Sequence, residues 1–223
     1  NPTWGFIPRG YIGQYETGQI YDFGKQMWRP LEEANLSHES VDDPWHLVSE
    51  NFHLVTTANL KLSTDVLKRL EAVYLQVFRK YDLFFKGTQG AMKIFGMGPT
   101  TQKLLVHFYK DRDQFMQFSE PPVEWAAGFY DGGRHASFFY ADGPQSVDYT
   151  TLQHELVHQI LGENSPGGGP SWLAEGAAVY LEDAFFDEDQ RLSIGSISDH
   201  RWGVSYLRNL RAGGDEHSFK EML

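Results

Sequence analysis

Two histidines and a glutamate stand close together in the segment 154–158, whose sequence is HELVH. On a helix, His154 and His158 lie one turn apart on the same face, so both imidazoles can reach a single metal ion. Glu155 projects about 100° around the helix from His154, which places its carboxylate beside the ion and not among its ligands. The pattern therefore predicts a metal centre in which Glu155 is positioned to act as a base.

A catalytic zinc site usually has three protein ligands and leaves its fourth position to water. We expect the third ligand to be Glu175, within the segment 172–178 (WLAEGAA). The glycine- and proline-rich stretch 163–170 (ENSPGGGP) is a loop that can reverse the chain and return this carboxylate to the imidazoles. Zinc held by two histidines and one glutamate lowers the pKa of a bound water to about 7, which makes peptide hydrolysis feasible at neutral pH.

Both parts of this centre are predicted to lie on helices. The apolar positions between 147 and 161 fall on one helical face, namely Leu152, Leu156, Val157, Ile160 and Leu161. Gly162 is expected to end this helix as its C-terminal cap. A second helix is expected over 171–184, and the small residues beside Glu175 (Ala174, Gly176 and Ala177) predict close helix packing there.

Strand and helix patterns precede the centre. The segments 51–57 (NFHLVTT) and 103–109 (KLLVHFY) are rich in apolar and β-branched residues and are predicted to be strands. A long helix is expected between them with Ser63 as N-cap, because apolar residues recur at helical spacing over 66–81. A short helix is expected over 111–118, capped by the aspartate at its start.

A hairpin is predicted immediately before the centre, with strands over 125–130 and 135–141. The turn 131–133 (DGG) is expected to supply the positive backbone angles that a tight connection requires. The second strand, 136–140 (ASFFY), is interpreted either as an edge strand that pairs with an extended peptide or as a core strand.

The order of elements predicts an α+β fold: a small β-sheet with a long helix, then the helix of the HExxH motif, then the glutamate-bearing helix. Residues 1–45 are rich in glycine and aromatics and are expected to form an N-terminal β-hairpin appendage and linker. Residues 46–223 are then the main domain, since 223 residues are too few for two large cores.

Composition excludes several classes of partner. Nineteen basic and thirty acidic side chains give a net charge of −11, which repels the phosphates of nucleic acid. No run of apolar residues is long enough for a membrane span. Because the chain has no cysteine, a transition metal must be held by imidazole and carboxylate.

The two motifs, HELVH (154–158) and WLAEGAAVYLE (172–182), resemble those of the gluzincin branch of zinc metallopeptidases, specifically the peptidase-MA-like domains of unknown function. The resemblance extends from about residue 52 to 210 and implies a zincin-like domain. It implies Zn²⁺ as cofactor, a peptide or protein as substrate, and an extracytoplasmic location. The segment by which aminopeptidases hold a substrate's amino terminus is missing, which favours an endopeptidase.

Carried over by residue, the resemblance makes His154, His158 and Glu175 the metal ligands and Glu155 the general base. Glu182 is similar to a glutamate that supports a ligand histidine, although an exposed carboxylate at a helix end is the alternative. Val179 departs from thermolysin-like enzymes, which carry an aspartate there.

Other hypotheses stay open. The chain could be a non-catalytic, metal-containing binding or scaffold module of a larger protein, or it could hydrolyse a non-peptide amide at the same site. His200 and Tyr206 are candidates for stabilising the oxyanion, although a tyrosine in the segment 202–210 is also well suited to helix packing.

Overall fold

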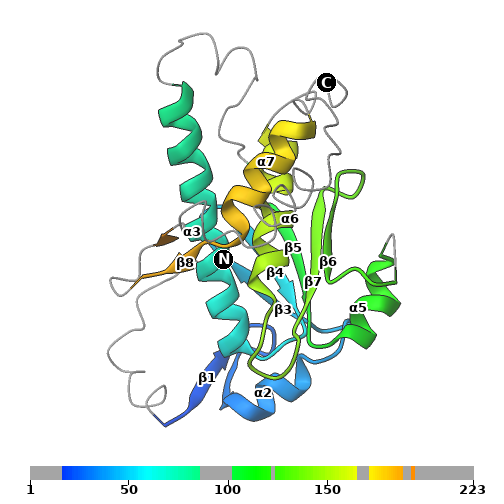
Figure 1. The fold of residues 1–223 in the computed structure, drawn as a ribbon. Coiled ribbons are helices and arrows are strands. Elements are labelled where there is room, and N and C mark those ends of the chain that lie inside the picture. Colours follow the sequence, from blue (N-terminus) through cyan, green and yellow to red (C-terminus); the bar gives the residue numbers. More distant parts are fainter. Residues whose placement is uncertain (1–16, 86–101, 122–123, 165–170, 188–191, 194–223) are drawn as a thin grey trace. The chain divides into compact units, whose positions relative to one another are not determined.

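The computed structural model describes residues 17–85, 102–121, 124–164, 171–187 and 192–193 (Figure 1). The chain divides into two compact units, Asn1–Glu182 and Asp183–Leu223. The described part is mixed α+β, as predicted. In the second unit, β8 (Phe185–Phe186) pairs antiparallel with β9 (Leu192–Ser193). None of the helices in the described ranges combines the length and the hydropathy that crossing a bilayer requires.

A five-stranded mixed sheet organises the first unit, in the order β3-β4-β5-β7-β6. Its strands are β3 (Trp45–Val48), β4 (Phe52–Thr56), β5 (Leu104–Tyr109), β6 (Gly128–Asp131) and β7 (Ala136–Tyr140). The three central strands β4, β5 and β7 run parallel, and the outer strands β3 and β6 are antiparallel to their neighbours. The strands predicted over 51–57 and 103–109 are confirmed.

Helices cover both faces of the sheet (Figure 1). On one face lie α3 (Leu60–Phe85) and α6 (Tyr149–Asn164), and α7 (Ser171–Glu182) packs on α6. On the other face α5 (Arg112–Ser119) inserts Phe115 among the rings of Tyr109, Phe129 and Tyr140. The alternation of side chains along each strand supplies an apolar surface to both helix layers, because successive residues of a strand point to opposite faces of the sheet.

The N-terminus of α3 differs from the prediction. The helix begins at Leu60, and Asn59 caps it by accepting a hydrogen bond from the Leu62 amide (2.9 Å). Ser63, the expected N-cap, is fully buried inside the first turn, and its hydroxyl lies 3.0 Å from the Thr56 hydroxyl. Both residue types cap helices well, so composition alone did not separate them. The cap of α5 is confirmed, since Asp111 accepts from the Gln114 amide at 2.8 Å.

The β6–β7 hairpin forms as predicted, but by a different turn. The positive φ falls on His135 (53°), and neither Gly132 nor Gly133 has one. Asp131 closes the turn instead, because its carboxylate accepts from the amides of Gly133 (2.8 Å) and Arg134 (3.1 Å). The edge-strand interpretation of 136–140 is wrong: β7 lies between β5 and β6, and β6 is the edge.

The N-terminal segment contains a hairpin of β1 (Gln19–Asp22) and β2 (Met27–Pro30), followed by α2 (Leu31–Ser37), a helix that the sequence did not predict. Asp22 is fully buried and accepts from Arg29 (3.1 Å), while its Oδ2 also lies 3.2 Å from His38 Nε2. Residues 17–45 belong to the same compact unit as the sheet. A domain boundary near residue 45 stays a prediction.

Candidate metal centre

Helix α6, which carries the HELVH motif, is capped and deeply seated. Asp148 accepts from the amides of Thr150 and Thr151, each at 3.1 Å, and from the Thr151 hydroxyl at 2.7 Å. The apolar face predicted for this helix is fully buried at Leu152, Leu156, Val157 and Ile160. Burying this face against the sheet and α3 turns the opposite face of α6, with the two motif histidines, away from the core.

Two buried glutamines flank the histidines and fix α6 in place. Gln159 accepts from the Ser137 hydroxyl on β7 (2.9 Å) and donates to the Leu105 carbonyl on β5 (2.8 Å). Gln153 donates to the Glu182 carbonyl at 2.6 Å, which binds the last turn of α7. Neither glutamine was predicted as functional from the sequence. The sequence does contain a signal for them: two amide side chains lie next to the apolar face of the helix, where a buried amide needs a hydrogen-bond partner.

Gly162 lies inside α6, which continues to Asn164, so the predicted C-cap is wrong. A Cβ atom at this position would lie only 2.9 Å from the hydroxyl oxygen of Tyr130. The glycine therefore allows the Tyr130 ring of β6 to lie against the helix, where its hydroxyl donates to Glu163 (2.7 Å). Burial and Glu163 both raise the pKa of Tyr130, which keeps this hydroxyl protonated as a donor.

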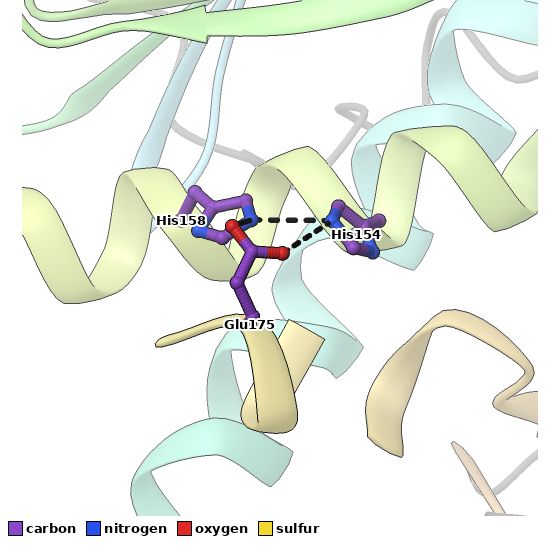
Figure 2. A group of neighbouring side chains, drawn as sticks. All are labelled: His154, His158 and Glu175. Carbon is purple, nitrogen blue, oxygen red and sulfur yellow. Dashed lines mark hydrogen bonds and ion pairs between the residues drawn. The ribbon is translucent and has the colours of Figure 1, made fainter. Parts of the chain in front are cut away.

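The histidines and Glu175 meet where α7 crosses α6. His154 and His158 extend from the same side of α6, and Glu175 reaches them from α7 (Figure 2). The two Nε2 atoms are 3.2 Å apart, and each lies 3.5 Å from a different oxygen of the Glu175 carboxylate. The three residues predicted as ligands thus come together, although Glu175 lies on a separate helix.

These separations fit a small tetrahedral ion. Ligand distances of 2.0–2.1 Å at the tetrahedral angle place any two ligand atoms about 3.3 Å apart. The 3.2 Å between the two Nε2 atoms is close to this figure, and a set of one ligand atom from each of the three residues lies within 4.8 Å. Two imidazoles and one carboxylate leave a fourth position for a solvent molecule or a substrate, which is the ligand number of catalytic zinc sites.

Glu182 orients the first of these histidines. Its Oε2 lies 2.8 Å from His154 Nδ1, at an ion-pair and hydrogen-bond distance. A carboxylate at Nδ1 holds the proton on that nitrogen and leaves the lone pair of Nε2 directed at the common centre. Of the two alternatives predicted for Glu182, the structure supports the contact with His154 over an exposed carboxylate, since the Glu182 side chain is mostly buried (23 % exposed).

Glu155 follows His154 on α6 and contacts the edge of the sheet. Its Oε2 accepts from the backbone amide of Tyr130 on β6 at 3.2 Å. A cavity of about 240 Å³ opens next to it, lined by Thr150, Thr151, His154, Glu155 and Glu182. The carboxylate therefore has one fixed donor and a neighbouring space large enough for a small part of a ligand.

Exposure increases from α6 to α7. The imidazoles of His154 and His158 are 22 % and 19 % exposed, whereas the Glu175 carboxylate is 61 % exposed. The predicted close packing at Gly176 is wrong, because a Cβ atom there would meet nothing within 4 Å among the described residues. Ala178, two positions later, is the fully buried residue that packs instead.

His200 and Tyr206 lie outside the described residues. Comparisons with protein-family models, with curated proteins and with solved structures found no match for this chain. The case for a function therefore depends on the geometry of the centre itself.

Proposed function

We propose that this chain is a zinc-dependent hydrolase of peptide bonds, with His154, His158 and Glu175 as metal ligands. The observation that carries the proposal is the convergence of two Nε2 atoms and one carboxylate from separate helices, at separations of 3.2 and 3.5 Å. Among metals that accept imidazole and carboxylate, zinc matches this ligand set and number. When bound, zinc lowers the pKa of a coordinated water to about 7 and polarises a carbonyl.

In this proposal Glu155 is the general base. It removes a proton from the attacking water and returns that proton to the leaving amine, so one carboxylate serves both steps. Its neighbours support this role, because the Tyr130 amide holds one oxygen at 3.2 Å and the carboxylate lines the cavity beside His154. Glu182 keeps the His154 ring oriented through its 2.8 Å contact.

The proposed substrate is an extended peptide, and the proposed mode of cleavage is internal. The edge position of β6 supports this, since an edge strand offers backbone donors and acceptors to an added strand. The Tyr130 amide points away from β7 toward Glu155, which sets the outer edge of β6 beside the proposed base. A zincin-like domain is proposed on the same grounds: motif helix under the sheet, antiparallel edge strand next to it, and a second helix returning a glutamate.

Metal analysis and one peptidase assay test the proposal. Glu155→Gln should keep the zinc content of the wild type and lose cleavage of a mixed peptide library by at least about a hundredfold. Glu175→Ala should bind one zinc fewer per chain than the wild type and lose the activity. Glu32→Gln, on the exposed surface of α2, is the matched control and should behave like the wild type.

Wild-type protein that binds no zinc would end the proposal. Wild-type protein that binds one zinc per chain but cleaves no member of the library would favour the non-catalytic binding module. Cleavage of acylated amines without cleavage of peptides would indicate a non-peptide amide as substrate.

A further inference from the structure

Three histidines lie on adjacent strands of the sheet: His46 on β3, His53 on β4 and His107 on β5. The register pairs His46 with Val55 and Val55 with His107, so all three side chains lie on one face. On this face, His46 Nδ1 and His53 Nε2 are 3.0 Å apart, and the two ring centroids are 5.3 Å apart.

This face is not the face that carries the metal centre. His107 stacks on Phe138 of β7 at a centroid distance of 5.0 Å, and Phe138 belongs to the core cluster beneath α5. The preceding residue of β7, Ser137, points the opposite way and donates a hydrogen bond to Gln159 of α6. The sheet therefore separates the histidine cluster from His154 and His158.

We propose that His46 and His53 form a second metal site, for a divalent transition ion that accepts imidazole, such as Ni²⁺, Cu²⁺ or Zn²⁺. Their nitrogen separation of 3.0 Å is close to the 3.2 Å between the Nε2 atoms of His154 and His158. It is also close to the roughly 3.3 Å expected for two ligands of one tetrahedral ion. Water molecules complete the coordination shell in a site with two protein ligands.

The sheet holds these two side chains at a fixed spacing. Both belong to paired strands, where His46 faces Val55 and His53 faces Val48, so neither backbone can move without breaking the ladder. In the metal-free pair, one ring donates its N–H to the lone pair of the other. For an ion to bind between the rings, the proton of the donor ring must move to the other nitrogen of that ring. Both rings then stay neutral, and each directs a lone pair at the ion.

The surroundings keep the pair available for a metal. Burial and the neighbouring His46 lower the pKa of His53, which favours the neutral ring that a metal requires. His46 is exposed, so ions in solution can reach the pair. The chain has no cysteine, so no thiolate competes with these imidazoles for a transition ion.

Equilibrium dialysis of metal-free protein against Ni²⁺ tests the site. Wild-type protein should bind one more ion per chain than His46→Ala and one more than His53→Asn, each folded by circular dichroism. His135→Ala is the matched control: this histidine is 72 % exposed and bonds to Glu163, so its loss should leave the count unchanged.

Equal counts for the wild type, His46→Ala and His53→Asn would overturn the inference, as would an equal loss in His135→Ala. The result does not depend on the proposed hydrolase, because it is a difference between proteins that all keep His154, His158 and Glu175. A protein that bound nothing at those three residues would still show the difference of one ion.

Discussion

Replacing Gly162 by alanine tests the contact between α6 and the edge strand. The added Cβ atom would lie 2.9 Å from Tyr130 Oη, 3.0 Å from Cε1 and 3.2 Å from Cζ. These distances are shorter than van der Waals contact, so the ring must move, and its 2.7 Å hydrogen bond to Glu163 resists that movement.

The magnitude follows from two opposing effects. Alanine in place of glycine stabilises a helix by about 0.5–1 kcal/mol. Overpacking at a site that cannot relax costs about 1–3 kcal/mol. The difference lies between about 0 and 2.5 kcal/mol, so we expect Gly162→Ala to destabilise the protein by roughly 1 kcal/mol, which for a chain of this size lowers Tm by roughly 2–4 °C.

Gly176 of α7 provides the control, because a Cβ atom there meets nothing within 4 Å among the described residues. Gly176→Ala should show only the helix preference and raise the stability by up to about 1 kcal/mol. Thermal and guanidinium unfolding, followed by circular dichroism, measure both variants. In a Tyr130→Ala background, Gly162→Ala should become stabilising as well. A Gly162→Ala protein as stable as Gly176→Ala, with Tyr130 intact, would refute the reasoning.

Three further predictions concern the surroundings of the centre. Glu182→Gln should weaken zinc binding by about 10–100-fold, because a neutral amide supports the ring of His154 less than a carboxylate does; chelator competition measures this, and unchanged affinity would contradict it. Gln159→Leu should cost about 1–3 kcal/mol in urea unfolding, since it removes the acceptor of the buried Ser137 hydroxyl and a donor to the Leu105 carbonyl, and a cost below about 1 kcal/mol would contradict this. Burial, more than neighbouring charge, lowers the pKa of His107 to about 4, so the unfolded chain takes up a proton first as the pH falls below 6.5. This contribution to stability is complete above pH 6.5 and is lost as the pH falls toward 4; His107→Phe should remove about 2 kcal/mol of the loss between pH 7.5 and 5, and identical pH profiles of Tm would contradict it.

What the sequence predicted correctly depends mostly on local spacing. His154 and His158 share a helical face because of the helix repeat alone, and the strands over 51–57 and 103–109 follow from their own residues. Glu175 is the exception: its position beside the two histidines was predicted from a loop able to reverse the chain and a second helix that follows it.

The errors have a common physical origin, since each depends on a partner far away in the chain. Gly162 was predicted to end the helix, but the structure gives another reason for glycine at this position: the Tyr130 ring of β6 leaves no room for a side chain. The order of strands, which makes β6 the edge, is set by packing between elements and not within them. The hydrogen-bond partners of Gln153 and Gln159 lie at least 22 positions away along the chain, so no local sequence pattern could predict them.

The two glutamines beside the motif have a mechanical consequence. Apolar contacts have no preferred direction, so a helix held by them alone can roll about its axis or slide along it. Hydrogen bonds do have direction, and here they act at both ends of the motif, toward the sheet through Gln159 and toward α7 through Gln153. These bonds therefore restrict both the rotation and the translation of α6. The imidazoles of His154 and His158 are held in a fixed orientation toward Glu175, with or without a bound ion.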